Sequence, residues 1–209
     1  MKKIIRSRAG LTTVELLGAA LCATVILSAL YGFYREQLVY LLLQETKTAT
    51  LEDARGALDI MIRELRNAGW WDKGFAPPSC KRIVTATPTI IHIQADLNGD
   101  EDCDGATGEN VTYDLYKGTE SCPGMILRRN GICLVANVVV TAGEQLFTYF
   151  DANDAQLAAN PPVDAVKRVR IKFSVEVPDP SPQGKRSGKT IRSTLASSVE
   201  FRNPAGTLP

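Results

Sequence analysis

The stretch "SRAGLTTVELLGAALCATVILSALYGFY", residues 7–34, begins with basic residues and then turns apolar. Its nineteen residues from Leu16 to Tyr34 carry no charge, and roughly 20 such residues are enough to cross the hydrocarbon core of a bilayer. The stretch therefore predicts a transmembrane helix over residues 11–34. Lysines and arginines at 2, 3, 6 and 8 precede it without an acidic residue, so the N-terminus is expected to stay in the cytoplasm and the rest of the chain outside it.

A cleaved secretory signal also begins basic and then becomes apolar. Here the apolar run is long for a signal sequence, and no small-x-small cleavage site followed by a polar start occurs at its far end. We therefore expect the run to remain as a single-pass anchor.

The net charge of the exported part of the chain argues against nucleic acid as a partner. The formal net charge is +1, and four of the basic residues lie before the apolar run, so the exported part is mildly acidic. Binding to nucleic acid requires a clustered basic face, and we expect no such partner.

Beyond the membrane segment the sequence permits one continuous helix, because no proline occurs before Pro77. Six apolar residues follow one another at spacings of three and four, which places them on one helical face: Leu51, Ala54, Leu58, Met61, Leu65 and Ala68. Gly69 follows, a residue that suits the left-handed position at a helix end. Residues 35–69 are thus predicted to be an amphipathic continuation of the helix.

The pattern of residues 70–209 is extended instead of helical. Alternating apolar and polar residues, as in "VRIKFSVEV", indicate half-buried strands, and turn formers such as "RRNG" and "PDPSPQGKRSG" separate them. The candidate strands are residues 82–86, 89–94, 110–116, 125–129, 133–140, 145–150, 166–177 and 190–201. The expected fold class is α+β, with the long N-terminal helix packed on an antiparallel β-sheet domain.

Four of the five cysteines fall in the exported part: Cys80, Cys103, Cys122 and Cys133. An oxidising compartment favours their pairing, so two disulfides are expected among three possible connectivities. Cys122 with Cys133 is the simplest pair, because it closes a short hairpin-like loop. Cys22 lies in the apolar run, where it serves as a small hydrophobic residue.

Glu15 places a carboxylate at the start of the apolar run, where an ion is costly unless it finds a partner. If a protease cut after Gly10, Leu11 would carry a new ammonium group one helical turn from Glu15. A neighbouring subunit's ammonium group could then pair with the carboxylate and fix the register of stacked helices. In the simpler interpretation, Glu15 only reaches the headgroups and Gly10 only marks a boundary.

The string "RAGLTTVELL" resembles the processing site of type IV prepilins. "ARGALDIMIRELRNAGW", "DLNGDEDCDG", "LRRNG", "FTYFDAND" and "VEFRN" together resemble the PilW-like minor pilins, which are related to the J-type minor pseudopilins of type II secretion. One departure is Leu11, where the family usually has Phe.

The resemblance implies a pilin-like fold and a role in a filament. Gly10 would be the cleavage position for prepilin peptidase, Leu11 the N-methylated residue and Glu15 the assembly carboxylate. The implied partners are other major and minor pilins or pseudopilins, the inner-membrane assembly platform and membrane lipid. The implied location is the bacterial inner membrane with the body in the periplasm, and then a type IV pilus or, alternatively, a secretion pseudopilus.

The loop "DLNGDEDCDG" offers side-chain oxygens at every second position: Asp96, Asn98, Asp100, Asp102 and Asp104. This spacing resembles the first half of an EF-hand loop, but Glu101 replaces the required glycine and Thr107 stands where a bidentate glutamate is expected. The sequence leaves two interpretations open, a calcium site and a solvated acidic turn. Apart from calcium it indicates no cofactor.

Catalysis is not expected. The chain has a single histidine, His92, no Cys-x-x-Cys motif and no pair of carboxylates placed for acid–base chemistry. An anchored hydrolase and a calcium-gated adhesive module remain as alternatives of a different class from the filament subunit.

Overall fold

The computed structural model describes residues 12–71, 79–103, 108–179 and 181–202. The chain divides into two compact units, Met1–Glu45 and Thr46–Pro209. The boundary lies inside helix α1, Thr13–Asn67, so one 55-residue helix belongs to both units.

In the first unit, α1 is long and apolar enough to cross a membrane. None of the residues in its most apolar stretch is buried, as the sequence predicts for a single-pass anchor. The hydroxyl groups of Thr24 and Ser28 donate to the carbonyl oxygens of Leu21 and Val25, each at 2.8 Å. These bonds satisfy the polar side chains within the helix itself.

In the second unit, α1 buries the predicted apolar stripe. Ala54, Met61 and Leu65 are fully buried and Leu58 nearly so, while Leu51 packs at the edge of the core. The helix ends at Asn67.

Gly69 then adopts a positive φ of 75°, and its N–H donates to Gln94 O at 2.9 Å. A Cβ atom at Gly69 would lie 2.8 Å from Cγ of Arg82. Both the backbone conformation and the close contact therefore require glycine here.

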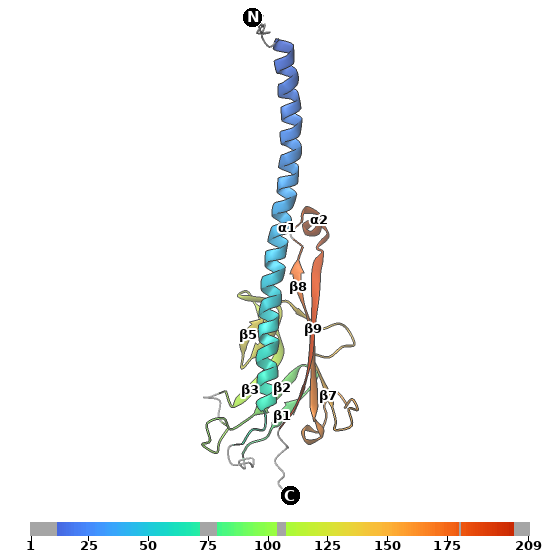
Figure 1. The fold of residues 1–209 in the computed structure, drawn as a ribbon. Helices are drawn as coiled ribbons and strands as arrows, with labels where there is room; N and C mark the ends of the chain where they lie inside the picture. The colour runs from blue at the N-terminus through green and yellow to red at the C-terminus, as the bar shows by residue number, and fades with distance from the viewer. Residues whose placement is uncertain (1–11, 72–78, 104–107, 180, 203–209) are drawn as a thin grey trace, which may run out of the picture. The chain divides into compact units, whose positions relative to one another are not determined.

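The strands form two antiparallel sheets, as Figure 1 shows. The first has five strands in sequential order: β1 Ile83–Ala86, β2 Ile90–Gln94, β3 Asn110–Thr119, β4 Cys122–Arg129 and β5 Ile132–Val135. The second contains β6 Val138–Val139, β7 Phe147–Phe150, β8 Arg168–Pro178 and β9 Thr190–Glu200. Strand β8 pairs with each of the other three.

The predicted strand over residues 133–140 is in fact two strands, β5 and β6, which belong to different sheets. Asn137 lies between them with a φ of 53°. This left-handed residue ends β5 and redirects the chain, and asparagine tolerates that conformation better than most residues. A period-two pattern continues through such a break, so the sequence could not separate the two strands.

The other connections contain two short helices, the 3-10 helix η1, Val163–Ala165, and α2, Pro182–Ser187. The segment "PDPSPQGKRSG", expected to be a plain turn, contains α2. Ser181 caps α2 by accepting a hydrogen bond from Gly184 N at 2.9 Å, and Gly188 ends it at a φ of 62°.

One hydrophobic core joins the helix stripe to the inner faces of both sheets. Its largest fully buried side chains include Tyr113, Tyr149, Phe147, Phe173 and Met61. Figure 1 shows the second half of α1 beside strands of both sheets. The expected α+β fold, a long helix packed on antiparallel strands, is confirmed.

The two predicted disulfides are present. Cys80 bonds to Cys103 and Cys122 to Cys133, with Cα–Cα distances of 5.9 and 6.7 Å. Trp71 packs with Cys80 and Cys103 in a small separate cluster. Cys22 is a free, exposed thiol.

Candidate functional site

The first candidate site is the start of α1, where Glu15 and Thr12 form a capping box. Thr12 N and Thr12 Oγ1 both donate to Glu15 Oε2 at 2.9 Å, and Glu15 N donates to Thr12 Oγ1 at 3.3 Å. The reciprocal bonds satisfy backbone donors that a helix start would otherwise leave free. Gly10 and Leu11 lie outside the described residues.

The capping box gives Glu15 a local partner that the sequence analysis missed, although the pattern Thr-x-x-Glu is readable in the sequence. Within the described residues, every hydrogen bond made by the Glu15 carboxylate goes to Oε2. Glu15 is exposed, so Oε1 can accept a bond from a second partner. The cap and an intermolecular ion pair are compatible.

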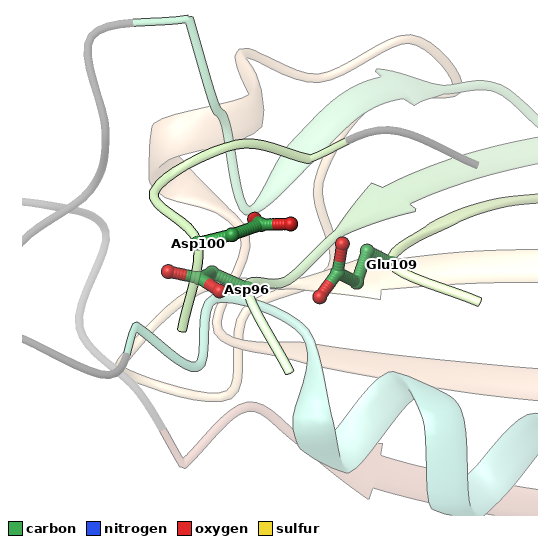
Figure 2. Close-up of side chains that lie close together, drawn as sticks. All are labelled: Asp96, Asp100 and Glu109. Carbon is green, nitrogen blue, oxygen red and sulfur yellow. The ribbon is translucent and has the colours of Figure 1, made fainter. Parts of the chain in front are cut away.

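The second candidate site is the acidic loop after β2. Carboxylate oxygens of Asp96, Asp100 and Glu109 all lie within 4.8 Å of one another. Asp96 is 3% and Glu109 1% exposed, whereas Asp100 is exposed. Figure 2 shows the three carboxylates converging, with Asp96 and Asp100 on the loop and Glu109 entering from the other side. Like charges 4 Å apart repel by about 4 kcal/mol near a protein surface, so this arrangement requires compensation.

Backbone amides supply part of that compensation. Glu109 Oε1 accepts hydrogen bonds from Leu97 N at 2.7 Å and Asn98 N at 2.9 Å. Asp96 Oδ1 accepts one from Gly99 N at 2.7 Å. The second oxygen of Glu109, Oε2, is buried and has no hydrogen-bond partner within the described part of the chain.

The predicted oxygen series is only partly brought together. Asp96 and Asp100 belong to the cluster. Asn98 supports it: its Nδ2 donates to Asp100 Oδ2 at 2.6 Å, and its Oδ1 accepts from Asp100 N at 2.9 Å. The carboxylate of Asp102 is not in the cluster, although Asp102 N donates to Asp100 Oδ1 at 3.2 Å. Asp104 lies outside the described residues.

Glu109 is the residue that sequence analysis missed. It directly precedes β3 and lies beyond a twelve-residue loop counted from Asp96, so no spacing rule pointed to it. The only local signal is its place immediately before a strand. Its approach to Asp96 follows from the antiparallel pairing of β2 with β3, in which Gln94 faces Asn110.

Beside this site, Glu64 of α1 forms hydrogen bonds with two residues of the first sheet, Tyr113 and Arg129. Arg129 donates to Glu64 Oε1 from Nε at 3.0 Å and from Nη2 at 2.7 Å, and the hydroxyl of Tyr113 donates to Glu64 Oε2. Burial, reinforced by the bond to Glu64, raises the pKa of Tyr113 well above its usual range. The hydrogen bonds between Arg129 and Glu64 also raise the pKa of Arg129. The phenol therefore stays a donor at any physiological pH.

A cavity of about 200 Å³ lies between this contact and the acidic loop. Its lining includes Glu64, Asn67, Glu109 and Arg129. Water and small ions therefore have space next to Glu109.

No protein-family model matches this sequence, and no curated protein or solved structure is significantly similar to it. The functional assignment therefore depends on these two sites and on the sequence patterns around them.

Proposed function

We propose that this chain is a minor pilin. The first part of α1 anchors it in the bacterial inner membrane, prepilin peptidase cuts after Gly10, and the new N-terminus at Leu11 is methylated. The processed subunit then joins, or primes assembly of, a type IV pilus, with the unit from Thr46 onward on the periplasmic side.

The observation that carries the proposal is the position of Glu15. Its carboxylate lies in the first turn of a helix able to cross a membrane, five residues after Gly10 in a segment with a basic flank. A charge in lipid is retained where it has a role and a partner. The open Oε1 of Glu15 can accept the N-terminal ammonium group of a neighbouring subunit.

The second unit supports the same role. Its helical stripe is already covered by two sheets of the same chain, so this half of α1 is fixed to a β domain instead of being free to bind elsewhere. A subunit with an apolar membrane helix and a folded β domain suits a filament whose helices form the core and whose domains form the surface. Other pilins and the assembly platform would be its partners.

A minor pseudopilin of a type II secretion pseudopilus would use the same helix and the same carboxylate. The two assignments differ in the filament that contains the subunit. Affinity purification of the tagged chain from cross-linked cells discriminates them, because pilus subunits copurify in one case and secretion pseudopilins in the other.

Mass spectrometry of the membrane-extracted chain tests processing. In cells with prepilin peptidase, we expect a mature N-terminus at Leu11 carrying one methyl group; in cells without the peptidase, an N-terminus at Met1. An N-terminus at Met1 in both strains would refute the proposal.

A pair of isosteric variants tests the role of Glu15. Glu15→Gln removes the charge, whereas Thr12→Val removes the hydroxyl of the capping box and retains the carboxylate. If Glu15 pairs with a neighbouring terminus, Glu15→Gln lowers the amount of subunit in sheared filaments and Thr12→Val does not, while both variants are processed and inserted. Equal losses for the two variants would assign Glu15 to helix capping alone.

A further inference from the structure

We propose that Asp96, Asp100 and Glu109 together bind one Ca²⁺ ion. This inference concerns the folded second unit and does not depend on assembly into a pilus.

Two independent observations support the site. Three carboxylates from two separate chain segments converge so that their oxygens lie within 4.8 Å, and Figure 2 shows Glu109 directed toward both aspartates. In addition, Glu109 is 1% exposed, and its Oε2 has no hydrogen-bond partner among the residues that the structure describes. Buried polar atoms are almost always paired, so an unpartnered oxygen on a carboxylate that is directed toward two other carboxylates indicates a missing cationic ligand.

Among the described residues, no arginine or lysine forms an ion pair with Asp96, Asp100 or Glu109. Arg63 and Arg129 line the same cavity as Glu109. Arg63 is exposed, and the guanidinium group of Arg129 makes a bidentate contact with Glu64. The backbone amides that bond to the cluster hold Oε1 of Glu109 and Oδ1 of Asp96. These bonds fix the orientation of both carboxylates, and they leave Glu109 Oε2 for an ion.

The chemistry of the site favours calcium. Its donors are all carboxylate oxygens, which are hard ligands, and the nearest cysteine in sequence, Cys103, is bonded to Cys80. Ca²⁺ accepts six to eight oxygens in irregular geometry, including bidentate carboxylates and water, whereas Mg²⁺ requires a near-ideal octahedron. Two aspartates on a loop and one buried glutamate fit the less demanding ion, with water in the remaining positions.

A bound ion would connect the loop to the sheet. Asp96 and Asp100 belong to the connection after β2, and Glu109 precedes β3. Asp96 N also donates to Trp70 O at 2.8 Å, next to the end of α1. The ion would therefore stabilise the region where the helix, the loop and the first sheet meet.

The test uses the full chain in detergent micelles after removal of metal with a chelator. Calorimetric titration with CaCl₂ should show one ion bound per chain, and saturating CaCl₂ should raise Tm. Glu109→Gln should weaken binding at least tenfold and abolish the rise in Tm. Glutamine keeps the Oε1 acceptor for the two loop amides, so this variant should fold in chelator at least as stably as the wild type.

Two further variants make the result decisive. Asp100→Asn changes an exposed residue, so it leaves folding intact and should also weaken Ca²⁺ binding at least tenfold. Glu120→Gln removes the same charge in the exposed β3–β4 turn and should bind Ca²⁺ like the wild type.

Three results would overturn the proposal. The first is the absence of both heat and a shift in Tm when the wild-type chain is titrated with millimolar CaCl₂. The second is wild-type affinity in Glu109→Gln or Asp100→Asn. The third is tighter binding of MgCl₂ than of CaCl₂, which would contradict the assignment of the ion.

Discussion

Burial of the helix stripe should contribute more to the stability of the second unit than the polar contact beside it. Leu65 and Glu64 are neighbours on α1, but Leu65 is fully buried in the core, whereas Glu64 bonds to Arg129, the last residue of β4, and both of these side chains are partly exposed. Substitution of Leu65 measures the contribution of the apolar stripe. Substitution of Arg129 measures the contribution of the ion pair with Glu64, the residue next to Leu65 on α1.

The structure sets the expected magnitudes. Truncation of a buried leucine to alanine costs about 2–5 kcal/mol. Because Leu65 is fully buried in the main core cluster, we expect about 3 kcal/mol for Leu65→Ala. The side chains of Arg129 and Glu64 are 28% and 22% exposed, so solvent screens their attraction. Arg129→Met should cost about 1–2 kcal/mol, between an exposed and a buried ion pair.

Thermal unfolding of the oxidised full chain in detergent, followed by near-ultraviolet circular dichroism, measures both effects. A domain of this size loses about 2–4 °C in Tm per kcal/mol, so Leu65→Ala should lower Tm by about 6–12 °C. Leu41→Ala is the matched control, because Leu41 is exposed on the same helix and lies in the first unit. A larger loss of Tm for Arg129→Met than for Leu65→Ala would refute the reasoning.

Three further predictions concern the same unit. Cys103→Ser opens a disulfide that spans 23 residues and should destabilise the unit by about 3 kcal/mol through loop entropy; unchanged denaturant stability would contradict this. Gly118→Ala should lower Tm strongly, because a Cβ atom there would lie 2.0 Å from a carbonyl oxygen of β4, and a stable variant would contradict that packing. Burial raises the pKa of both Tyr113 and Tyr149, so these phenols stay protonated in the native state while unfolded tyrosines ionise near pH 10. Stability should fall as pH rises above about 10, and ultraviolet absorbance should show that both ionise only on unfolding.

Much of the fold could be predicted from local patterns. The stripe from Leu51 to Ala68 has the period of a helix, and all of its members are buried except Leu51, which is partly buried. Ala57, which lies outside the predicted stripe, is buried as well. Most strands lie within a few residues of the predicted segments. Successive side chains of a strand point to opposite faces of the sheet, so apolar and polar residues alternate wherever one face is buried. The break at Asn137 was missed, since a change of sheet leaves that alternation intact.

The candidate sites also include one feature that nearby residues predict and others that depend on contacts between distant residues. The Thr12–Glu15 capping box spans three residues and could have been identified from the sequence. The pairing of Glu64 with Arg129 spans 65 residues, and no local pattern selects one partner among the 24 basic residues of the chain. The approach of Glu109 to Asp96 and Asp100 likewise depends on a long-range contact, the pairing of β2 with β3.

Hydropathy and periodicity along the chain thus determined the long apolar helix, its amphipathic continuation and the α+β class, because these properties depend on neighbours one to four positions away. The choice of Glu109 as third acidic residue, the contact of Arg129 with Glu64 and the division of strands between two sheets were decided only in the folded chain. Each of these requires segments distant in sequence to be brought within a few ångströms, and that proximity is set by the packing of the whole unit.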